Sequence, residues 1–281
     1  MEGKYIVITG ASDGIGAEAA RQLHHMGAKV VIIGRSPEKT KRVAEELGAN
    51  SFVADFSRLD DVRKLAHALE QTYPHIDVLV NNAGGIFGKR EVTVDGHEKT
   101  MQVNHLAHFL LTKLLMDTLL SSKATVVNTS SVANELFSDL DINDLDLKQS
   151  FTPNKAYGNA KLANILFTKE LHNRYHTQGL AAVAFHPGNV STNFANDTTS
   201  FFRFVYRTPL AKLLLLSPSK GADTLVWLAS STAGKDWKPG EYYVKRKVAK
   251  AHQRAYDTKL AHELWEASER LTQPKVQNSS R

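Results

Sequence analysis

The chain has 281 residues, of which 42% are hydrophobic and 23% are charged; this balance is typical of globular proteins and excludes the disordered, collagen-like and coiled-coil classes. It contains no cysteine, which excludes a disulfide framework, a thiolate zinc site and a cysteine nucleophile. The net charge of +6 is dispersed, and its densest cluster, between 245 and 254, lacks an RNA-binding signature, so we expect no nucleic-acid partner.

Short apolar runs alternate along the chain with longer segments of helical periodicity. Strands are expected at 5–9, 29–33, 51–54, 77–80, 124–129, 180–185 and, as an edge strand, 241–244. Helices are expected at 15–26, 37–47, 59–72, 97–120, 157–175, 219–229 and 258–271. Such alternation indicates βαβ units, whose right-handed crossovers place helices on both faces of a parallel sheet. We therefore predict an α/β fold with a single Rossmann-type, doubly wound parallel sheet.

The same pattern predicts one domain over residues 1–281, because no linker, repeat or low-complexity stretch interrupts it. Two irregular regions, 133–154 and 188–218, have the length of functional loops. No apolar run approaches the roughly 20 residues of a membrane span. No signal-peptide pattern opens the sequence either, so we expect a cytoplasmic protein without a membrane span.

A glycine-rich turn, TGASDGIG, lies between the first expected strand and the first expected helix, from Thr9 to Gly16. Glycines let backbone N–H groups approach a pyrophosphate, and the helix N-terminus adds the positive end of its dipole. The spacing is GxxxGxG rather than GxGxxG, and an ordinary tight turn is the competing interpretation. The strand–turn–helix context favours a dinucleotide site.

The end of the second strand predicts which dinucleotide binds. NAD sites usually carry a carboxylate about 20 residues after the turn, but this sequence has Gly34 followed by Arg35. A guanidinium can bind a 2′-phosphate bidentately, with help from Ser36 and Lys39, so NADP(H) is favoured over NAD(H). Asp13 counts against this preference because some NADP sites have a basic residue there. A solvated surface arginine is the competing interpretation.

Further cofactor contacts are expected where the third and fourth strands end. Asp55 and Phe56 follow the third strand, where the adenine would rest. The segment NNAG, residues 81–84, ends the fourth strand. Ligands of open α/β sheets bind at this carboxyl edge.

A tyrosine and a lysine carry the expected chemistry. Tyr157 and Lys161 are four residues apart and share one helix face, while Ser130 and Ser131 end the fifth strand at the same sheet edge. A phenol has a pKa of about 10, which a neighbouring ammonium lowers. The tyrosine can then act as general acid in reduction and general base in oxidation, and a serine hydroxyl can stabilise the negative charge on the substrate oxygen.

The motifs TGASDGIG, NNAG, NTSS, YGNAK and HPGNVST follow one another between Thr9 and Thr192. Together they resemble the classical short-chain dehydrogenase/reductase family. The segments AYGNAKLANILFTKEL and LWEASERL resemble its retinol-dehydrogenase-like branch, although we expect no N-terminal anchor like that of the membrane-bound members. The resemblance implies an oxidoreductase that transfers hydride between a nicotinamide cofactor and a carbonyl or alcohol substrate.

The resemblance also implies a catalytic tetrad of Asn104, Ser131, Tyr157 and Lys161. Asn104 would hold a helix distortion and a water that relays protons to Lys161, which also binds the nicotinamide ribose. Ala160 replaces a serine that is frequent in the family, and the spacing from serine to tyrosine is long. The expected cofactor-binding residues are Gly10, Ser12, Asp13, Gly14, Ile15, Gly16, Arg35, Asp55, Phe56, Asn82, Ala83, Gly84, Tyr157, Lys161, Pro187, Gly188, Val190 and Thr192.

The resemblance places a substrate lid at about 189–218, and we expect a C-terminal helical extension at about 250–275. The many aromatic residues of the lid predict an apolar pocket for a ketone, an aldehyde or a retinol-like or steroid-like alcohol. Packing of the lid on the body or on a partner subunit is the competing interpretation. The substrate, the physiological direction and the choice between a homodimer and a homotetramer stay open.

Two other classes of function compete with hydride transfer. An NADP(H)-binding redox sensor without turnover is the main alternative, and an intact acid–base set argues against it. An extended-type epimerase or dehydratase is disfavoured by the chain length and by the glycine spacing. His172 and His176 have helical spacing but no third ligand pattern near them, so we expect no metal site.

Overall fold

Eight strands form one sheet at the centre of the protein, in the order β3-β2-β1-β4-β5-β6-β7-β8. The computed structural model describes residues 1–188 and 217–274. The strands from β3 to β7 are parallel to their neighbours, and β8 is antiparallel to β7. The strands are β1 (Tyr5–Thr9), β2 (Lys29–Gly34), β3 (Asn50–Val53), β4 (Val78–Asn81), β5 (Thr125–Thr129), β6 (Ala181–His186), β7 (Tyr242–Val244) and β8 (Lys247–Val248). The predicted doubly wound parallel sheet is confirmed.

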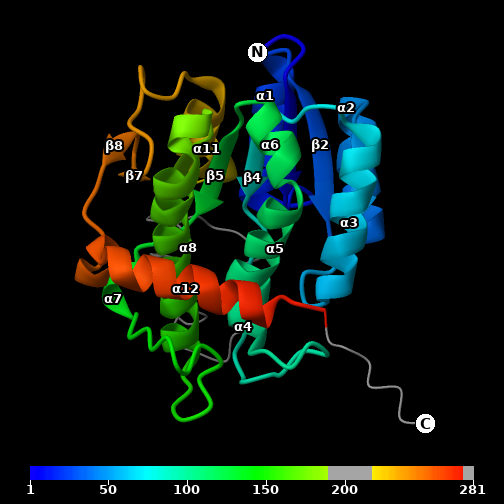
Figure 1. Cartoon of the computed structure of the whole chain (residues 1–281). Coiled ribbons are helices and arrows are strands. Elements are labelled where there is room, and N and C mark those ends of the chain that lie inside the picture. Colours follow the sequence, from blue (N-terminus) through cyan, green and yellow to red (C-terminus); the bar gives the residue numbers. More distant parts are fainter. Residues whose placement is uncertain (189–216, 275–281) are drawn as a thin grey trace.

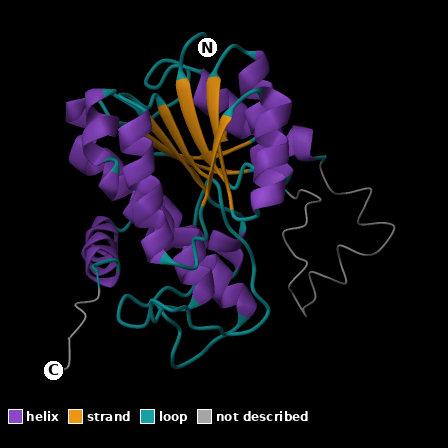
Figure 2. Cartoon of the chain, turned by 90° about the vertical axis from the view of Figure 1, so that its right-hand side faces the viewer, coloured by secondary structure: helices purple, strands orange, loops and turns teal. Residues whose placement is uncertain are grey.

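Helices cover both faces of the sheet (Figures 1 and 2). One face packs against α1 (Gly14–His25), α2 (Pro37–Leu47) and α11 (Pro218–Ser230). The other packs against α3 (Leu59–Thr72), α5 (Ala107–Leu114), α6 (Met116–Ser121), α8 (Pro153–Tyr175) and α12 (Thr258–Leu271). The shorter elements are α4 (Lys99–Met101), the π-helix η1 (Gln102–Leu106), α7 (Ala133–Leu136) and the 3-10 helices η2 (His176–Gln178) and η4 (Gln253–Tyr256).

The apolar strand runs are buried on both sides, as expected for strands inside a parallel sheet. In β1, Val7 contributes to the core beneath α3 and α5, whereas Ile6 and Ile8 contribute to the core beneath α1 and α11. All three side chains are fully buried. The continuous apolar runs in the sequence therefore reflect two cores, one on each face.

The continuous helix expected at 97–120 is interrupted, which corrects its extent, and the interruption lies at Asn104, where the resemblance implied a helix distortion. It begins at Lys99 and changes to a π-helix over Gln102–Leu106. The Asn104 side chain donates to the Thr100 carbonyl at 2.8 Å, the carbonyl that the backbone N–H of the same residue would reach in a regular α-helix. A side chain inserted in this way distorts the i→i−4 ladder, and periodicity alone does not reveal it.

The start of one helix and the place of one strand in the sheet also differ from expectation. Helix α8 begins at Pro153 rather than at 157, because the Thr152 hydroxyl accepts from the Lys155 N–H and proline occupies the first turn. The strand expected at the sheet edge is instead paired on both sides. The chain turns at Lys245 and Arg246, which both have positive φ angles, and returns as β8, which forms the edge.

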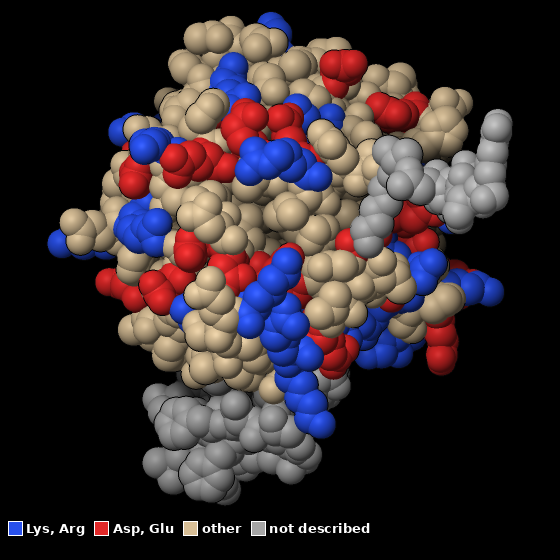
Figure 3. Space-filling view, turned by 60° about the horizontal axis from the view of Figure 1, so that its bottom comes forward, with Lys and Arg blue, Asp and Glu red and all other residues tan. Residues whose placement is uncertain are grey.

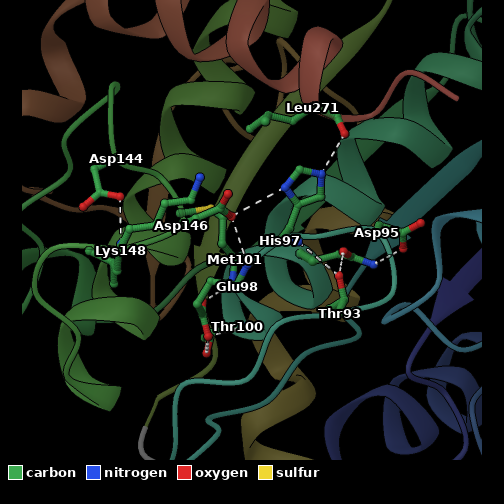
Figure 4. A network of polar contacts seen from close by, with 12 residues as sticks. Thr93, Asp95, His97, Glu98, Thr100, Met101, Asp144, Asp146, Lys148 and Leu271 are labelled. Atoms are coloured by element: carbon green, nitrogen blue, oxygen red, sulfur yellow. Dashed lines mark hydrogen bonds and ion pairs between the residues drawn. The ribbon is translucent and has the colours of Figure 1, made fainter. Parts of the chain in front are cut away.

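A polar network fixes the start of the interrupted helix (Figure 4). The Glu98 carboxylate caps α4 by accepting from the Thr100 and Met101 N–H groups, and the Asp146 carboxylate accepts from the Glu98 N–H at 2.9 Å. His97 Nε2 lies 2.9 Å from the Leu271 carbonyl at the end of α12. The network therefore ties this helix to the 138–152 region and to the last helix.

The surface carries charges of both signs. Figure 3 shows Lys and Arg side chains interspersed with Asp and Glu on the face turned toward the viewer. Within residues 1–188 and 217–274, no helix has the length and apolar character needed to cross a bilayer. The same residues contain no group of three or more side chains arranged to hold a metal ion.

Candidate active site

A cleft of about 770 Å³ opens at the carboxyl edge of the sheet. The expected cofactor-binding residues outside the lid all line it: Gly10, Ser12, Asp13, Gly14, Ile15, Gly16, Arg35, Asp55, Phe56, Asn82, Ala83, Gly84, Tyr157, Lys161, Pro187 and Gly188. Val190 and Thr192, with the rest of the lid up to residue 216, lie outside the described residues. Five loops and helix α8, which are far apart in the sequence, therefore meet in one cavity.

The glycine-rich turn brings backbone close to the cleft. Gly10 has a φ of +67°, which glycine adopts readily. A Cβ on Gly16 would lie 2.3 Å from the Gly10 carbonyl oxygen, so α1 packs against the turn only with glycine there. Asp13 caps α1 by accepting from the Gly14 N–H at 2.8 Å. The N-terminus of α1 and its dipole therefore face the cavity.

The end of β2 has no room for a side chain at Gly34. A Cβ there would lie 2.3 Å from Thr40 Oγ1 and 2.6 Å from the Ser12 side chain. The carboxylate that NAD sites usually place at this point is therefore sterically excluded. Arg35 follows, exposed at the rim of the cleft.

Two other residues expected to help at this rim already have partners. Lys39 Nζ pairs with the Asp13 carboxylate at 2.7 Å. The Ser36 hydroxyl accepts from the Lys39 N–H as the N-cap of α2. This pairing also neutralises Asp13, the residue that counted against a phosphate at this position.

Lys161 lies in the interior with its ammonium against Tyr157. Its side chain is 1% exposed, and its Nζ stands 5.3 Å from the centroid of the Tyr157 ring. The same Nζ donates to the Thr129 carbonyl at the end of β5, at 3.2 Å. Burial lowers the pKa of Lys161 to about 7. The Lys161 amine can therefore gain or lose a proton near neutral pH.

The two serines at the end of β5 have different surroundings. Ser130 is 1% exposed, and its hydroxyl donates to the Lys161 carbonyl at 2.7 Å. Ser131 is half-buried and lines the cleft, and its Oγ accepts from the Ala133 N–H at 3.2 Å. A hydroxyl that accepts can still donate. The Ser131 proton is thus the one that can reach a ligand in the cleft.

Asn104 does not line the cleft, unlike the other three members of the expected tetrad. It is fully buried in the π-helix. Its side chain forms a two-way pair with Gly85, donating to the carbonyl at 2.9 Å and accepting from the N–H at 3.1 Å. A Cβ on Gly84 would lie 2.4 Å from Asn104 Oδ1. Asn104 therefore fixes the loop after β4 against the π-helix.

Apolar side chains surround the tyrosine, and the sequence analysis missed them. Tyr157 packs with Ile86, Ala133 and Phe137, and the wall continues through Phe87 and Leu136. Leu136 is 62% exposed. The signal available in the sequence was the apolar pair directly after NNAGG, at the carboxyl end of a strand.

His186, at the end of β6, was also missed. It lines the cleft, and burial lowers its pKa to about 4. It is therefore a neutral imidazole at physiological pH. Its place at the carboxyl end of a strand, directly before Pro187, was the signal that could have identified it.

Comparison with known proteins gives a consistent result. Residues 4–201 match the family described as short chain dehydrogenase. A provisionally named daunorubicin C-13 ketoreductase of Streptomyces sp. (strain C5) is 37% identical over 276 residues, covering 95% of this chain and 92% of the relative. Human retinol dehydrogenase 11 is 34% identical over 276 residues, covering 95% of this chain and 85% of the relative.

Solved structures show the same architecture. An uncharacterised protein of Mycobacterium paratuberculosis superposes with a TM-score of 0.77 and 32% identity, covering 96% of this chain and 94% of the other. RhlG of Pseudomonas aeruginosa, in a complex with NADP, superposes with a TM-score of 0.68 and 25% identity, covering 86% of this chain and 94% of the other.

Proposed function

Because the chain belongs to the short-chain dehydrogenase/reductase family, in its retinol-dehydrogenase-like branch, we propose that it transfers hydride between NADP(H) and an apolar carbonyl or alcohol. Membership of the family makes it an oxidoreductase of carbonyl and alcohol substrates. The cofactor preference, the apolar substrate and the residue roles are the proposal.

The observation that carries the proposal is the meeting of Tyr157, Lys161 and Ser131 at one cleft. In reduction, the carbonyl carbon gains a hydride, and the Tyr157 hydroxyl gives its proton to the oxygen. Ser131 donates a hydrogen bond to that oxygen and stabilises its negative charge. The Lys161 ammonium favours the resulting phenolate. In oxidation, the phenolate takes the alcohol proton back.

The residues present fit a dinucleotide. Glycine is required at the turn by the close approach of Gly16 to Gly10, which leaves backbone N–H groups and the α1 N-terminus for a pyrophosphate. Asp55 and Phe56 would hold the adenine end, and Lys161 the nicotinamide ribose. The bound nicotinamide supplies the hydride chemistry.

The preference for NADP(H) rests on the rim of the cleft. Gly34 has no space for a carboxylate, so nothing at the end of β2 repels a 2′-phosphate. The Arg35 guanidinium is exposed beside it and has the geometry to bind phosphate bidentately. The NADP complex of RhlG supports the same assignment.

An apolar substrate is supported by the wall around Tyr157. Ile86 and Phe87 are buried and Phe137 is half-buried, while Val132 and Leu136 are 36% and 62% exposed. Exposed apolar side chains beside a reactive group are typical of small-molecule sites. We further propose that the chain acts as one catalytic domain, with a lid at about 189–218 and a C-terminal extension at about 250–275.

A substrate panel tests the proposal. Apolar ketones and aldehydes are assayed with NADPH and with NADH, and the matching alcohols with NADP⁺, by following nicotinamide absorbance. Turnover of bulky apolar carbonyls with NADPH is expected. Tight NADPH binding without turnover of any member would contradict the proposal and favour a redox sensor.

A further inference from the structure

A buried chain of polar contacts joins the last helix to the lysine of the site. The Ser268 Oγ, on α12, lies 3.0 Å from His105 Nε2. His105 Nδ1 lies 3.2 Å from Asn164 Oδ1 on α8. The Asn164 amide then donates to the Asn104 carbonyl and to the Thr129 carbonyl, each at 3.0 Å. The side chains of Ser268, His105 and Asn164 are each at most 2% exposed.

The protons in this chain have one consistent arrangement. Burial lowers the pKa of His105 to about 4, so the ring is neutral at working pH and carries a single N–H. Since an amide oxygen only accepts, that N–H is on Nδ1, and Nε2 accepts from the Ser268 hydroxyl. Asn164 uses both of its N–H groups on the two carbonyls. Every donor has an acceptor, so the amide cannot turn without breaking a bond.

The Thr129 carbonyl is the point where this chain meets the site. It accepts from Asn164 Nδ2 at 3.0 Å and from Lys161 Nζ at 3.2 Å. Thr129 also directly precedes Ser130 and Ser131. A group that fixes this carbonyl therefore fixes both the Lys161 ammonium and the end of β5, which presents Ser131.

We propose that Asn164 is a positioning residue for Lys161, and that His105 and Ser268 fix the orientation of its amide. The inference rests on the function proposed above. Asn164 does not line the cleft. It acts by holding the carbonyls of Asn104 and Thr129, so that the ammonium stands over the Tyr157 ring. Helix α12 is thereby part of the support of the active site.

The electrostatic surroundings are consistent with this role. The ionisable groups that sense the Lys161 charge from the π-helix and α5 are His105 and His108. Burial lowers the pKa of His108 to about 3, so both rings are neutral at working pH. On its own helix, the ammonium faces Tyr157. Neutral dipoles, rather than a counter-charge from these histidines, therefore hold the lysine.

The test compares Asn164→Leu with Thr168→Val. Thr168 lies one turn further along α8 and is fully buried. Its hydroxyl donates to the backbone carbonyl of Asn164 and accepts from Asn128 Nδ2, away from the lysine. Both substitutions remove a buried polar group from one helix, so a merely structural effect is shared. We expect Asn164→Leu to lower kcat about 10- to 100-fold, as misplaced reacting groups do, and Thr168→Val to change it much less.

A second readout needs no turnover. The free energy of unfolding is measured with urea from pH 7 to 10 for each variant and for the same variant carrying Lys161→Met, and the difference isolates the titration of Lys161. In Asn164→Leu the amine leaves its buried place, and we expect the pKa of Lys161 to move from about 7 toward its usual value, so that this pH-dependent difference shrinks. Thr168→Val keeps the wild-type difference. An unchanged difference in a folded Asn164→Leu protein overturns the proposal.

The Ser268→Ala substitution removes one hydroxyl and tests the end of the contact chain that lies on α12. If Ser268 acts through Asn164, its effect on kcat disappears in the Asn164→Leu background, because the two changes interrupt one chain. Additive effects of the two substitutions would overturn the link to α12. A wild-type enzyme without turnover would refute the proposed function instead, while the pH dependence of unfolding would still test the inference.

Discussion

Lys161 is the residue whose surroundings matter most to the proposed chemistry. An amine that is 1% exposed has lost most of its hydration, which disfavours the ammonium. Burial accordingly lowers its pKa to about 7. The sequence predicted the lysine and its tyrosine partner from their spacing. It did not predict the burial, which depends on the Thr129 carbonyl and on helices that are distant in the chain.

The burial of Lys161 predicts a pH-dependent stability. Its pKa is about 7 in the folded apoprotein, against about 10.4 in an unfolded chain, so between these values the unfolded chain binds more protons. The free energy of unfolding therefore rises with pH across this window, by up to about 1.4 kcal/mol per pH unit. Urea unfolding at a series of pH values from 7 to 10 measures this rise in the free energy of unfolding. Lys161→Met should lack this rise, and parallel curves for the two proteins would contradict the assignment.

Arg35 predicts a change in cofactor preference. Replacing it with serine removes the guanidinium proposed to bind the 2′-phosphate, while the ribose and pyrophosphate contacts remain. Loss of a charge-assisted bidentate contact costs about 1.5–3 kcal/mol, so we expect the Kd for NADPH to rise about 10- to 100-fold and the Kd for NADH to stay nearly constant. Fluorescence titration with NADPH and with NADH measures both Kd values for the wild type and for Arg35→Ser. The Lys41→Ser variant is the control, because Lys41 is an exposed lysine on the next helix that is paired with Glu45 and does not line the cleft. Equal weakening of both cofactors by Arg35→Ser would refute the preference.

At the scale of elements, periodicity located most helices and strands but not the break at Gln102–Leu106. The π-helix depends on Asn104 reaching Gly85, 19 residues away in the chain, and such contacts leave no periodic signal. The start of α8 at Pro153 could have been predicted, because threonine followed by proline is a common N-terminus. The turn between β7 and β8 was missed for a different reason: two basic residues adopt positive φ angles there, where glycine or asparagine is usual.

The π-helix and α5 predict a sensitivity to acid. Burial lowers the pKa of His105 to about 4 and that of His108 to about 3, below the value of about 6.5 in unfolded chains. The contribution of these neutral rings to the free energy of unfolding is present above pH 6.5 and is lost as the pH falls toward 4. For each histidine the loss is up to about 1.4 kcal/mol per pH unit. Urea unfolding of the wild type and His108→Gln checks this. A variant with the same acid slope as the wild type would contradict it.

At the scale of the whole molecule, the sequence predicted the class of fold correctly, because each apolar strand run was followed by a helix of adequate length. The cleft also formed from the predicted residues, since the carboxyl ends of parallel strands share one edge. The position of α12 was not predictable from periodicity. It lies across α8 and α5 (Figure 1), and its contacts are made by side chains from distant segments.

Trp265 predicts how strongly α12 is attached. Its ring is 2% exposed and lies 5.0 Å from Phe109 and 5.8 Å from Phe167, between ring centroids. Truncation of a buried tryptophan to alanine typically costs about 3–5 kcal/mol, so we expect Trp265→Ala to lower the free energy of unfolding by that amount. Trp265→Phe, which keeps an aromatic ring, should lose clearly less. A loss below about 1 kcal/mol in the alanine variant would show that α12 is not part of the cooperative core.

The most direct test of the central claim, that the Tyr157 hydroxyl moves the proton, is the turnover of a Tyr157→Phe protein. The substitution removes one oxygen and leaves the packing with Ile86 and Phe137 in place. With a carbonyl that the wild type reduces, we predict an unchanged fold, retained NADPH binding and a kcat lowered about 10²- to 10⁴-fold. A folded Tyr157→Phe enzyme that binds NADPH and turns over at the wild-type rate would contradict the account.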